Sequence, residues 1–129
     1  MKIETHNSID QELCGRPIAQ GEGYSRIELC TTLRMAVDET GLVHGGFLFG
    51  LADYAAMIAV NHPNVVLGAS EVRFLKPVKV GDVVVAEGRV TEVSGKKQIV
   101  SVNVVNGGAE VFKGEFTCIV PDAHVLRAP

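Results

Sequence analysis

The sequence predicts an α+β fold in which an antiparallel sheet wraps around one buried helix, and three observations lead to this prediction. Segment 45–61 is rich in alanine and apolar on nearly every side, which indicates a helix surrounded by protein. Turn residues separate the segments that follow it, and Asn106-Gly107 is a dipeptide typical of β-hairpins. Those segments alternate apolar and polar residues as half-buried strands do: 65–76, 83–93, 97–105 and 111–120.

Two further elements precede the central helix. Ser8-Ile9-Asp10-Gln11 has the pattern of a capping box and Gly15 ends it, so we expect a short helix over 7–14. The alternation over 25–37 predicts a strand. Its buried face would carry Ile27, Leu29, Thr31, Leu33, Met35 and Val37. The turn residues of segment 38–41 would end this strand.

Composition narrows the class of protein. The 129 residues match one ordinary domain, predicted over 1–129, and the 47% hydrophobic and 21% charged content excludes disorder. The net charge of −3, without a cluster of Lys and Arg, gives no reason to expect nucleic acid as a partner. The longest apolar run is interrupted by Asp53 and is shorter than the roughly 20 residues of a membrane span. We therefore expect neither nucleic acid nor membrane as a partner.

The cysteines give no framework for a disulfide or a zinc site. Cys14, Cys30 and Cys118 are odd in number, far apart and without a C-x-x-C pair. The N-terminus has no apolar signal core. These features predict a cytoplasmic protein with no metal.

The start of the central helix is the first candidate site. It reads Leu42-Val43-His44-Gly45-Gly46. A helix N-terminus carries unpaired N–H groups and partial positive charge, so it binds anions and stabilises an oxyanion. Glycines at this point allow a ligand carbonyl to approach the backbone closely. The alternative is that Gly45 and Gly46 only permit a tight turn.

Asp53 is the second candidate, because it lies two turns into a helix that is otherwise apolar. A lone buried carboxylate costs several kcal/mol unless it is paired or protonated. Helical spacing places Gly46, Gly50 and Asp53 on one stripe, which would leave an open slot between the helix start and the acid. The alternative is a structural Asp bonded to backbone or to a Tyr.

Other residues are weaker candidates. His44 is a candidate base, although a histidine at a helix start also caps or orients a loop. Arg73 and Lys76 precede Pro77 and would meet phosphates, or would simply be solvated. Three other histidines are scattered along the chain, and we expect them to be solvated: His6, His62 and His124.

The run from His44 to Asp53, His-Gly-Gly-Phe-Leu-Phe-Gly-Leu-Ala-Asp, resembles the H-G-G-x-x-x-x-L-A-D helix of the hotdog-fold thioesterases of the phenylacetate-pathway type. Asn61 matches an Asn that the family often has at the end of this helix. Segment 73–82 is similar to the family's F-L-x-P-x-x-x-G-D segment. The resemblance covers roughly residues 25–120.

The resemblance implies a hotdog fold and a homodimer, often a dimer of dimers, with the sheet continued between subunits. The Gly45 N–H of one subunit would bind the thioester carbonyl, and Asp53 of the other would act as general base or as nucleophile. Acyl-CoA would be the substrate and would run along the interface, with its phosphates near basic side chains. No cofactor is implied beyond the CoA of the substrate.

The sequence departs from the family at two positions. Asp38 stands where the family often has Asn; an ionised Asp only accepts hydrogen bonds, although Asp38 would also be able to hold water or be protonated near Asp53. Leu67 stands where many members have a supporting polar residue. Ser70 is three positions further on, which in a regular strand places it on the opposite face.

Two functions other than hydrolysis remain open. An acyl-CoA hydratase or dehydratase needs a His and a carboxylate, but Asp38 and His44 do not have that motif's spacing. A non-catalytic acyl-CoA sensor fits the departures at Asp38 and Leu67.

Overall fold

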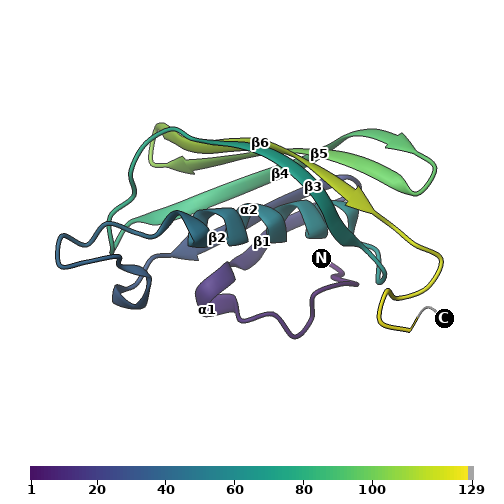
Figure 1. Cartoon of the computed structure of the whole chain (residues 1–129), viewed down its shortest axis with the longest axis horizontal. Coiled ribbons are helices and arrows are strands. Elements are labelled where there is room, and N and C mark those ends of the chain that lie inside the picture. Colours follow the sequence, from purple (N-terminus) through teal and green to yellow (C-terminus); the bar gives the residue numbers. More distant parts are fainter. Residues whose placement is uncertain (128–129) are drawn as a thin grey trace.

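A computed structural model describes residues 1–127 as one curved sheet around a long helix (Figure 1). The sheet is antiparallel, with strands in the order β1-β2-β4-β5-β6-β3. In chain order the elements are α1 (Gln11–Cys14), β1 (Arg16–Gly21), β2 (Tyr24–Cys30), the 3₁₀ helix η1 (Leu33–Met35), α2 (Gly45–Val60), β3 (Val66–Phe74), β4 (Val83–Ser94), β5 (Lys97–Asn106) and β6 (Ala109–Ile119).

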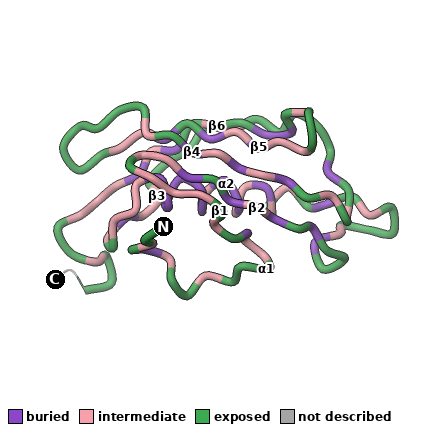
Figure 2. The backbone as a smooth tube through the Cα atoms, turned by 180° about the vertical axis from the view of Figure 1, so that it is seen from behind, coloured by how far each residue is buried: buried purple, intermediate pink, exposed green. Residues whose placement is uncertain are grey.

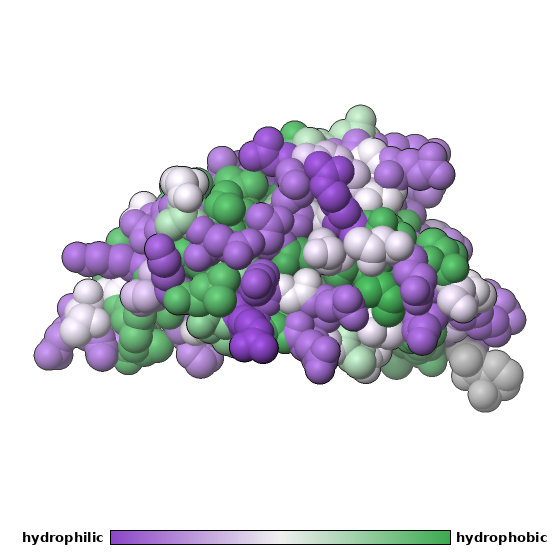
Figure 3. Space-filling view, turned by 90° about the horizontal axis from the view of Figure 1, so that it is seen from above, coloured by the Kyte–Doolittle hydropathy of each residue, from purple (hydrophilic) through white to green (hydrophobic). Residues whose placement is uncertain are grey.

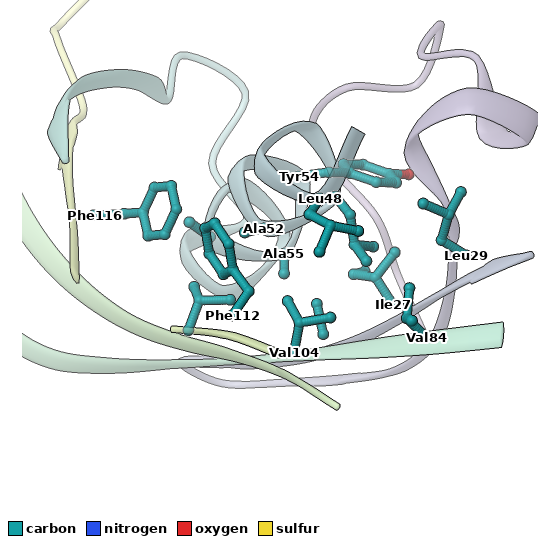
Figure 4. Close-up of a cluster of buried hydrophobic side chains, with 14 of the residues drawn as sticks. Ile27, Leu29, Leu48, Ala52, Tyr54, Ala55, Val84, Val104, Phe112 and Phe116 are labelled. Atoms are coloured by element: carbon teal, nitrogen blue, oxygen red, sulfur yellow. The ribbon is translucent and has the colours of Figure 1, made fainter. Parts of the chain in front are cut away.

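The helix α2 forms the centre of the core, as its composition predicts. Figure 2 shows it as a buried element enclosed by the sheet. Figure 4 shows Phe112 and Phe116 of the sheet on one side of α2, while Tyr54 extends from α2 on another side. The buried residues of α2 are Leu48, Leu51, Ala52, Tyr54, Ala55, Ala56, Met57, Ile58 and Ala59. The predicted hotdog architecture is therefore confirmed.

The bounds of the four strands after α2 lie within two residues of the predicted ones. Gly95 and Gly107 adopt φ angles of +60° and +62° in the hairpin turns, a conformation that glycine adopts without steric cost. Asn61 ends α2 with a φ of 52°, which explains why the helix stops at the predicted position. Local turn chemistry thus sets the boundaries of this half of the chain.

The N-terminal helix is shorter than the predicted 7–14. Asp10 caps it, with its carboxylate accepting hydrogen bonds from the N–H groups of Glu12 at 2.9 Å and Leu13 at 3.2 Å. The prediction with Ser8 as the cap was wrong, because Asp10 is also a strong capping residue and lies two positions later.

The predicted strand 25–37 was wrong in its second half. The structure ends β2 at Cys30, after which Thr31 donates a hydrogen bond of 2.6 Å to the carbonyl of Asp82. In η1, Met35 is fully buried whereas Leu33 is 78% exposed, so the alternation does not continue. Strand β1 was not predicted; it is a short edge strand, the place where a sheet tolerates a proline such as Pro17.

A β-bulge in β3 changes the face on which Ser70 lies. The register shifts between Leu67 and Ala69, so Leu67 pairs with Cys118 and Ser70 pairs with Phe116. Because Cys118 and Phe116 share the inner face of β6, Leu67 and Ser70 also share a face. The expectation that Ser70 lies opposite Leu67 was therefore wrong: the extra residue of the bulge returns Ser70 to the inner side.

The outer face of the sheet is mostly polar. Figure 3 looks down on it and shows hydrophilic side chains with apolar ones interspersed. Within residues 1–127, none of the helices combines the length and apolar character needed to cross a membrane.

Candidate functional site

The backbone fixes the start of α2 on both sides. The Val43 N–H donates to the carbonyl of Val78 at 2.8 Å, and the His44 N–H donates to the carbonyl of Met35 at 2.8 Å. Within the first turn, the Phe47 N–H donates to the His44 carbonyl at 3.0 Å. The N–H groups of the first residues of a helix have no partner within that helix. The start of α2, held by these hydrogen bonds, therefore presents the Gly45 N–H as a donor.

A cavity of about 310 Å³ lies at this helix start. It brings together three predicted site residues, Val43, Gly45 and Lys76. Phe74, 55% exposed, lies against Gly45, where an added Cβ would be 3.1 Å from the ring. The remaining lining is apolar and comes from Leu48, Leu75, Pro77 and Val78. A carbonyl that reaches the Gly45 N–H would thus have an apolar surface and one cationic side chain beside it.

The Asp53 carboxyl group is largely desolvated. Its Oδ1 is buried and has no hydrogen-bond partner among residues 1–127. Burial raises the pKa of Asp53 from 3.8 to about 6. Its charge also contributes to raising the pKa of two nearby thiols, Cys14 and Cys118, although burial is the larger cause for both. The alternative of a structural Asp bonded to backbone or Tyr leaves this orphaned oxygen unexplained.

A second cavity, of about 520 Å³, surrounds Asp53. Both ends of the described chain contribute to it. Its polar lining comes from Asp53, Thr5, His6 and His124, and its apolar lining comes from Met57, Pro63, Val65, Val66, Leu67, Val125 and Leu126. The carboxylate therefore opens on a space that is large enough for an organic group and mainly apolar.

The predicted open stripe on α2 is present only in part. Gly46 is exposed, and a Cβ added there would contact only the His44 ring, at 3.0 Å. At Gly50 an added Cβ would meet no atom within 4 Å. Within residues 1–127, the His44 ring covers the stripe at Gly46, and the stripe is open at Gly50.

The two key groups are nevertheless apart within one chain. Eight residues separate Gly45 from Asp53, which at about 1.5 Å per residue is about 12 Å along the helix axis. They also line different cavities. The Gly45 N–H and the Asp53 carboxylate of one chain therefore cannot act on the same carbonyl group.

The other predicted residues lie in different places. Asp38 is exposed, and its Oδ1 accepts hydrogen bonds from the N–H and hydroxyl of Thr40 at 2.9 Å and 2.6 Å, which lower the pKa of Asp38. Within the chain it is thus an ionised turn residue. His44 is at the cap position of α2 without a side-chain capping bond, and its ring lies over Gly46. Arg73 lines a groove on the outer face of the sheet, away from Lys76.

Sequence reasoning missed His6, which was expected to be solvated. The ring of His6 instead lines the Asp53 cavity, and its Nδ1 shares a hydrogen bond of 2.7 Å with the hydroxyl of Thr5. Burial lowers the pKa of His6. No local pattern could have revealed this, because His6 and Asp53 are far apart in sequence and belong to elements without a shared periodicity.

Comparison with known proteins places this geometry in a family. Residues 40–113 match the model of the thioesterase superfamily. Over 116 residues the chain is 54% identical to a protein of Aquifex aeolicus named methylthioribose-1-phosphate isomerase, covering 90% of this chain and 25% of that protein. It is 30% identical to transcription factor FapR of a Thermoanaerobacter species, covering 72% of this chain and 46% of that protein. The chain thus spans a quarter to a half of the length of these relatives.

Two solved structures match over more than four fifths of their length. PH1136 of Pyrococcus horikoshii has a TM-score of 0.96 and 55% identity, covering 98% of this chain and 97% of that one. PaaI of Escherichia coli, from the phenylacetic acid degradation operon, has a TM-score of 0.75 and 26% identity, with 81% of each chain covered. The family model and the curved antiparallel sheet around one long helix agree: this chain belongs to the thioesterase superfamily, with the hotdog fold.

Proposed function

We propose that the protein hydrolyses acyl-CoA thioesters with short-chain or aromatic acyl groups, in a site completed by two copies of the chain. The observation that carries this proposal is Asp53, which lines a mainly apolar cavity. Its pKa is raised to about 6, and its Oδ1 is buried without a hydrogen-bond partner in the described part of the chain. A desolvated carboxylate is a stronger base than an exposed one. With a pKa near 6 it is still mostly ionised at neutral pH, which suits a general base.

A second copy is needed because Gly45 and Asp53 of one chain are too far apart. The edge of the sheet supports such a pairing: β3 is nine residues long and mostly exposed, and in the described part of the chain it has no strand on its outer side. An edge of this kind presents unpaired N–H and C=O groups to another strand. Antiparallel pairing of β3 with its copy would continue the sheet around a two-fold axis. We expect a homodimer or a dimer of dimers, with Gly45 of one chain facing Asp53 of the other.

The reaction follows from these two groups. The Gly45 N–H donates a hydrogen bond to the thioester carbonyl, and the donor stabilises the oxyanion that forms when water attacks. Asp53 accepts a proton from this water as the new C–O bond forms. The C–S bond then breaks, and the departing thiolate takes a proton from Asp53. The products are a carboxylic acid and free CoA.

The cavity at the helix start supports the binding of CoA. Lys76 places a positive charge beside Gly45, where a phosphate or the polar arm of CoA would be attracted. Phe74 gives an exposed aromatic surface over the same position. CoA enters as part of the substrate, and the proposed steps require no further cofactor.

An acyl-CoA panel tests the proposal. Thiol release from short-chain and aromatic acyl-CoA esters is measured for the wild type, Asp53→Asn and Asp122→Asn, an exposed acid that makes a surface ion pair with Lys96. Asp53→Asn should lose about 10²-fold or more in kcat, because the general base is gone, while the control keeps its activity. The wild-type kcat/KM should fall as the pH drops through about 6. Comparable thiol release by Asp53→Asn would refute the role of Asp53.

The shared site has its own test. Gly45→Pro removes the N–H donor but suits the first position of a helix, and the backbone of His44 before it is already extended. Each single variant should be nearly inactive. In a mixed dimer of Gly45→Pro and Asp53→Asn, one of the two sites has both native groups, so each mixed dimer should have about half of the wild-type activity. A random 1:1 mixture, in which about half of the dimers are mixed, should therefore recover about a quarter. Absence of recovery in verified mixed dimers would place both groups of a site in one chain.

Binding without turnover is the second candidate function. It is favoured by the similarity to FapR, which is named a transcription factor, and by Asp38 in place of the family's Asn. Calorimetric binding of acyl-CoA without thiol release would support it. Loss of ultraviolet absorbance with crotonyl-CoA would instead indicate a hydratase.

A further inference from the structure

The N-terminal segment is fastened to the end of the central helix. The Asn61 side chain bonds to it twice: its Oδ1 accepts from the Glu4 N–H at 2.8 Å, and its Nδ2 donates to the Lys2 carbonyl at 2.8 Å. Thr5 is buried, 5% exposed, although it precedes the first helix. In Figure 1 this segment runs below the second half of α2. These contacts fix a part of the chain that is usually mobile in proteins.

The fastened segment carries His6 to a precise position. His6 has a φ of 55°, a left-handed conformation that costs a non-glycine residue about 1 kcal/mol or more and persists only where neighbours impose it. The Thr5 hydroxyl holds Nδ1, and the ring lies 6.2 Å from the ring of Tyr54. His6 and Asp53 line the same cavity. The left-handed backbone of His6, the hydrogen bonds that fasten its segment to Asn61, and the cavity that it shares with Asp53 together indicate that the position of this imidazole is important.

We propose that His6 positions the water that Asp53 deprotonates. When Nδ1 carries the proton shared with Thr5, Nε2 presents a free lone pair to the cavity. A water between Nε2 and Asp53 would donate one hydrogen to each, and its oxygen lone pair would then point toward the bound carbonyl. Oriented in this way, the water loses less entropy in the transition state. The inference rests on the proposed function, since it assigns a role in the same site.

Two substitutions at His6 separate this role from a structural one. His6→Asn retains a polar atom close to the Nδ1 position for Thr5 and tolerates the left-handed backbone, but it lacks Nε2. His6→Gly also fits this backbone and removes the whole side chain. If His6 only fastens the segment, Asn should restore function. If Nε2 positions the water, both variants should fail equally.

The expected result is a fall in kcat of about tenfold or more in both variants, with KM unchanged, because the substrate is still bound. Asn61→Gly, which keeps the left-handed helix end but cuts the tether, should lower kcat in the same direction with His6 intact. His62→Ala is the matched control, because His62 does not line the Asp53 cavity, while its Nδ1 accepts a hydrogen bond from the Asn64 N–H at 3.0 Å. Wild-type kcat in His6→Asn would overturn the proposal.

A second measurement does not depend on turnover. The titrating groups that share the cavity with His6 are Asp53 of α2 and His124 of the C-terminal segment, and Tyr54 of α2 packs on its ring. By NMR, the Asp53 carboxyl carbon should show two inflections with pH in the wild type, one of them from His6, and the latter should vanish in His6→Asn. If the wild type has no thioesterase activity, the proposed function fails. If the Asp53 carboxyl carbon shows no inflection from His6 while the wild type releases thiol, the role of His6 is refuted and the proposed function stands.

Discussion

Asp53 should weaken the fold that carries it, and removing its charge should make the protein more stable. In the folded state its pKa is about 6, against 3.8 for the unfolded chain, and burial is the cause. Because the folded pKa is the higher one, the folded state binds the proton more tightly. The loss of folding stability caused by the ionised Asp53 is therefore absent below pH 4, grows between pH 4 and 6, and is complete above pH 6.

The magnitude follows from the size of this shift. About two pKa units at about 1.4 kcal/mol each give about 3 kcal/mol at pH 8, and solvent at the open side of the carboxylate reduces this toward about 2 kcal/mol. Asn is nearly isosteric with the protonated acid and carries no charge. Asp53→Asn should thus unfold at a temperature about 8 °C higher than the wild type at pH 8, and at the same temperature at pH 4.

Thermal unfolding followed by circular dichroism, at one protein concentration across pH 4 to 8, measures this difference. The concentration is fixed because association stabilises the folded state. Asp122→Asn removes the same charge from an exposed site and should give a small, nearly constant difference. An Asp53→Asn variant that is no more stable at pH 8, or whose advantage does not shrink toward pH 4, would refute the claim that the carboxylate is desolvated.

Three further predictions concern the surroundings of the site. Gly50→Ala should raise the free energy of unfolding by up to about 1 kcal/mol, because alanine favours the helix and its Cβ meets open space. Gly50→Leu should still fold, but it should lose thiol release because its side chain blocks the stripe on α2. Ser25→Ala should cost about 1–3 kcal/mol in urea unfolding without changing kcat, because it leaves the buried Ala55 carbonyl without its 2.6 Å hydrogen bond. Iodoacetamide at pH 8 should label the exposed Cys30 and spare Cys118, whose pKa burial raises to about 12; rapid loss of the Cys118 thiol in mass spectra would contradict this.

The residues of the helix motif made the site predictable in outline. Each property that pointed to it is local: glycines at a helix start, an acid at a fixed helical spacing, and apolar residues on the remaining sides. The same holds for the hairpins, where Gly95 and Gly107 set the turns. Periodicity failed where local signals compete, as at Asp10 and after Cys30.

The sequence by itself determined the helix, the strands after it and the identity of the acid, because these depend on neighbours a few residues apart. Tertiary structure decided which of these residues meet. A single bulge returned Ser70 to the inner face, and the contact between Glu4 and Asn61, 57 residues apart, fastens the segment that brings His6 to the cavity of Asp53. The physical reason is that burial and register depend on the whole packed chain. The raised pKa of Asp53 follows from that packing, because burial is its cause.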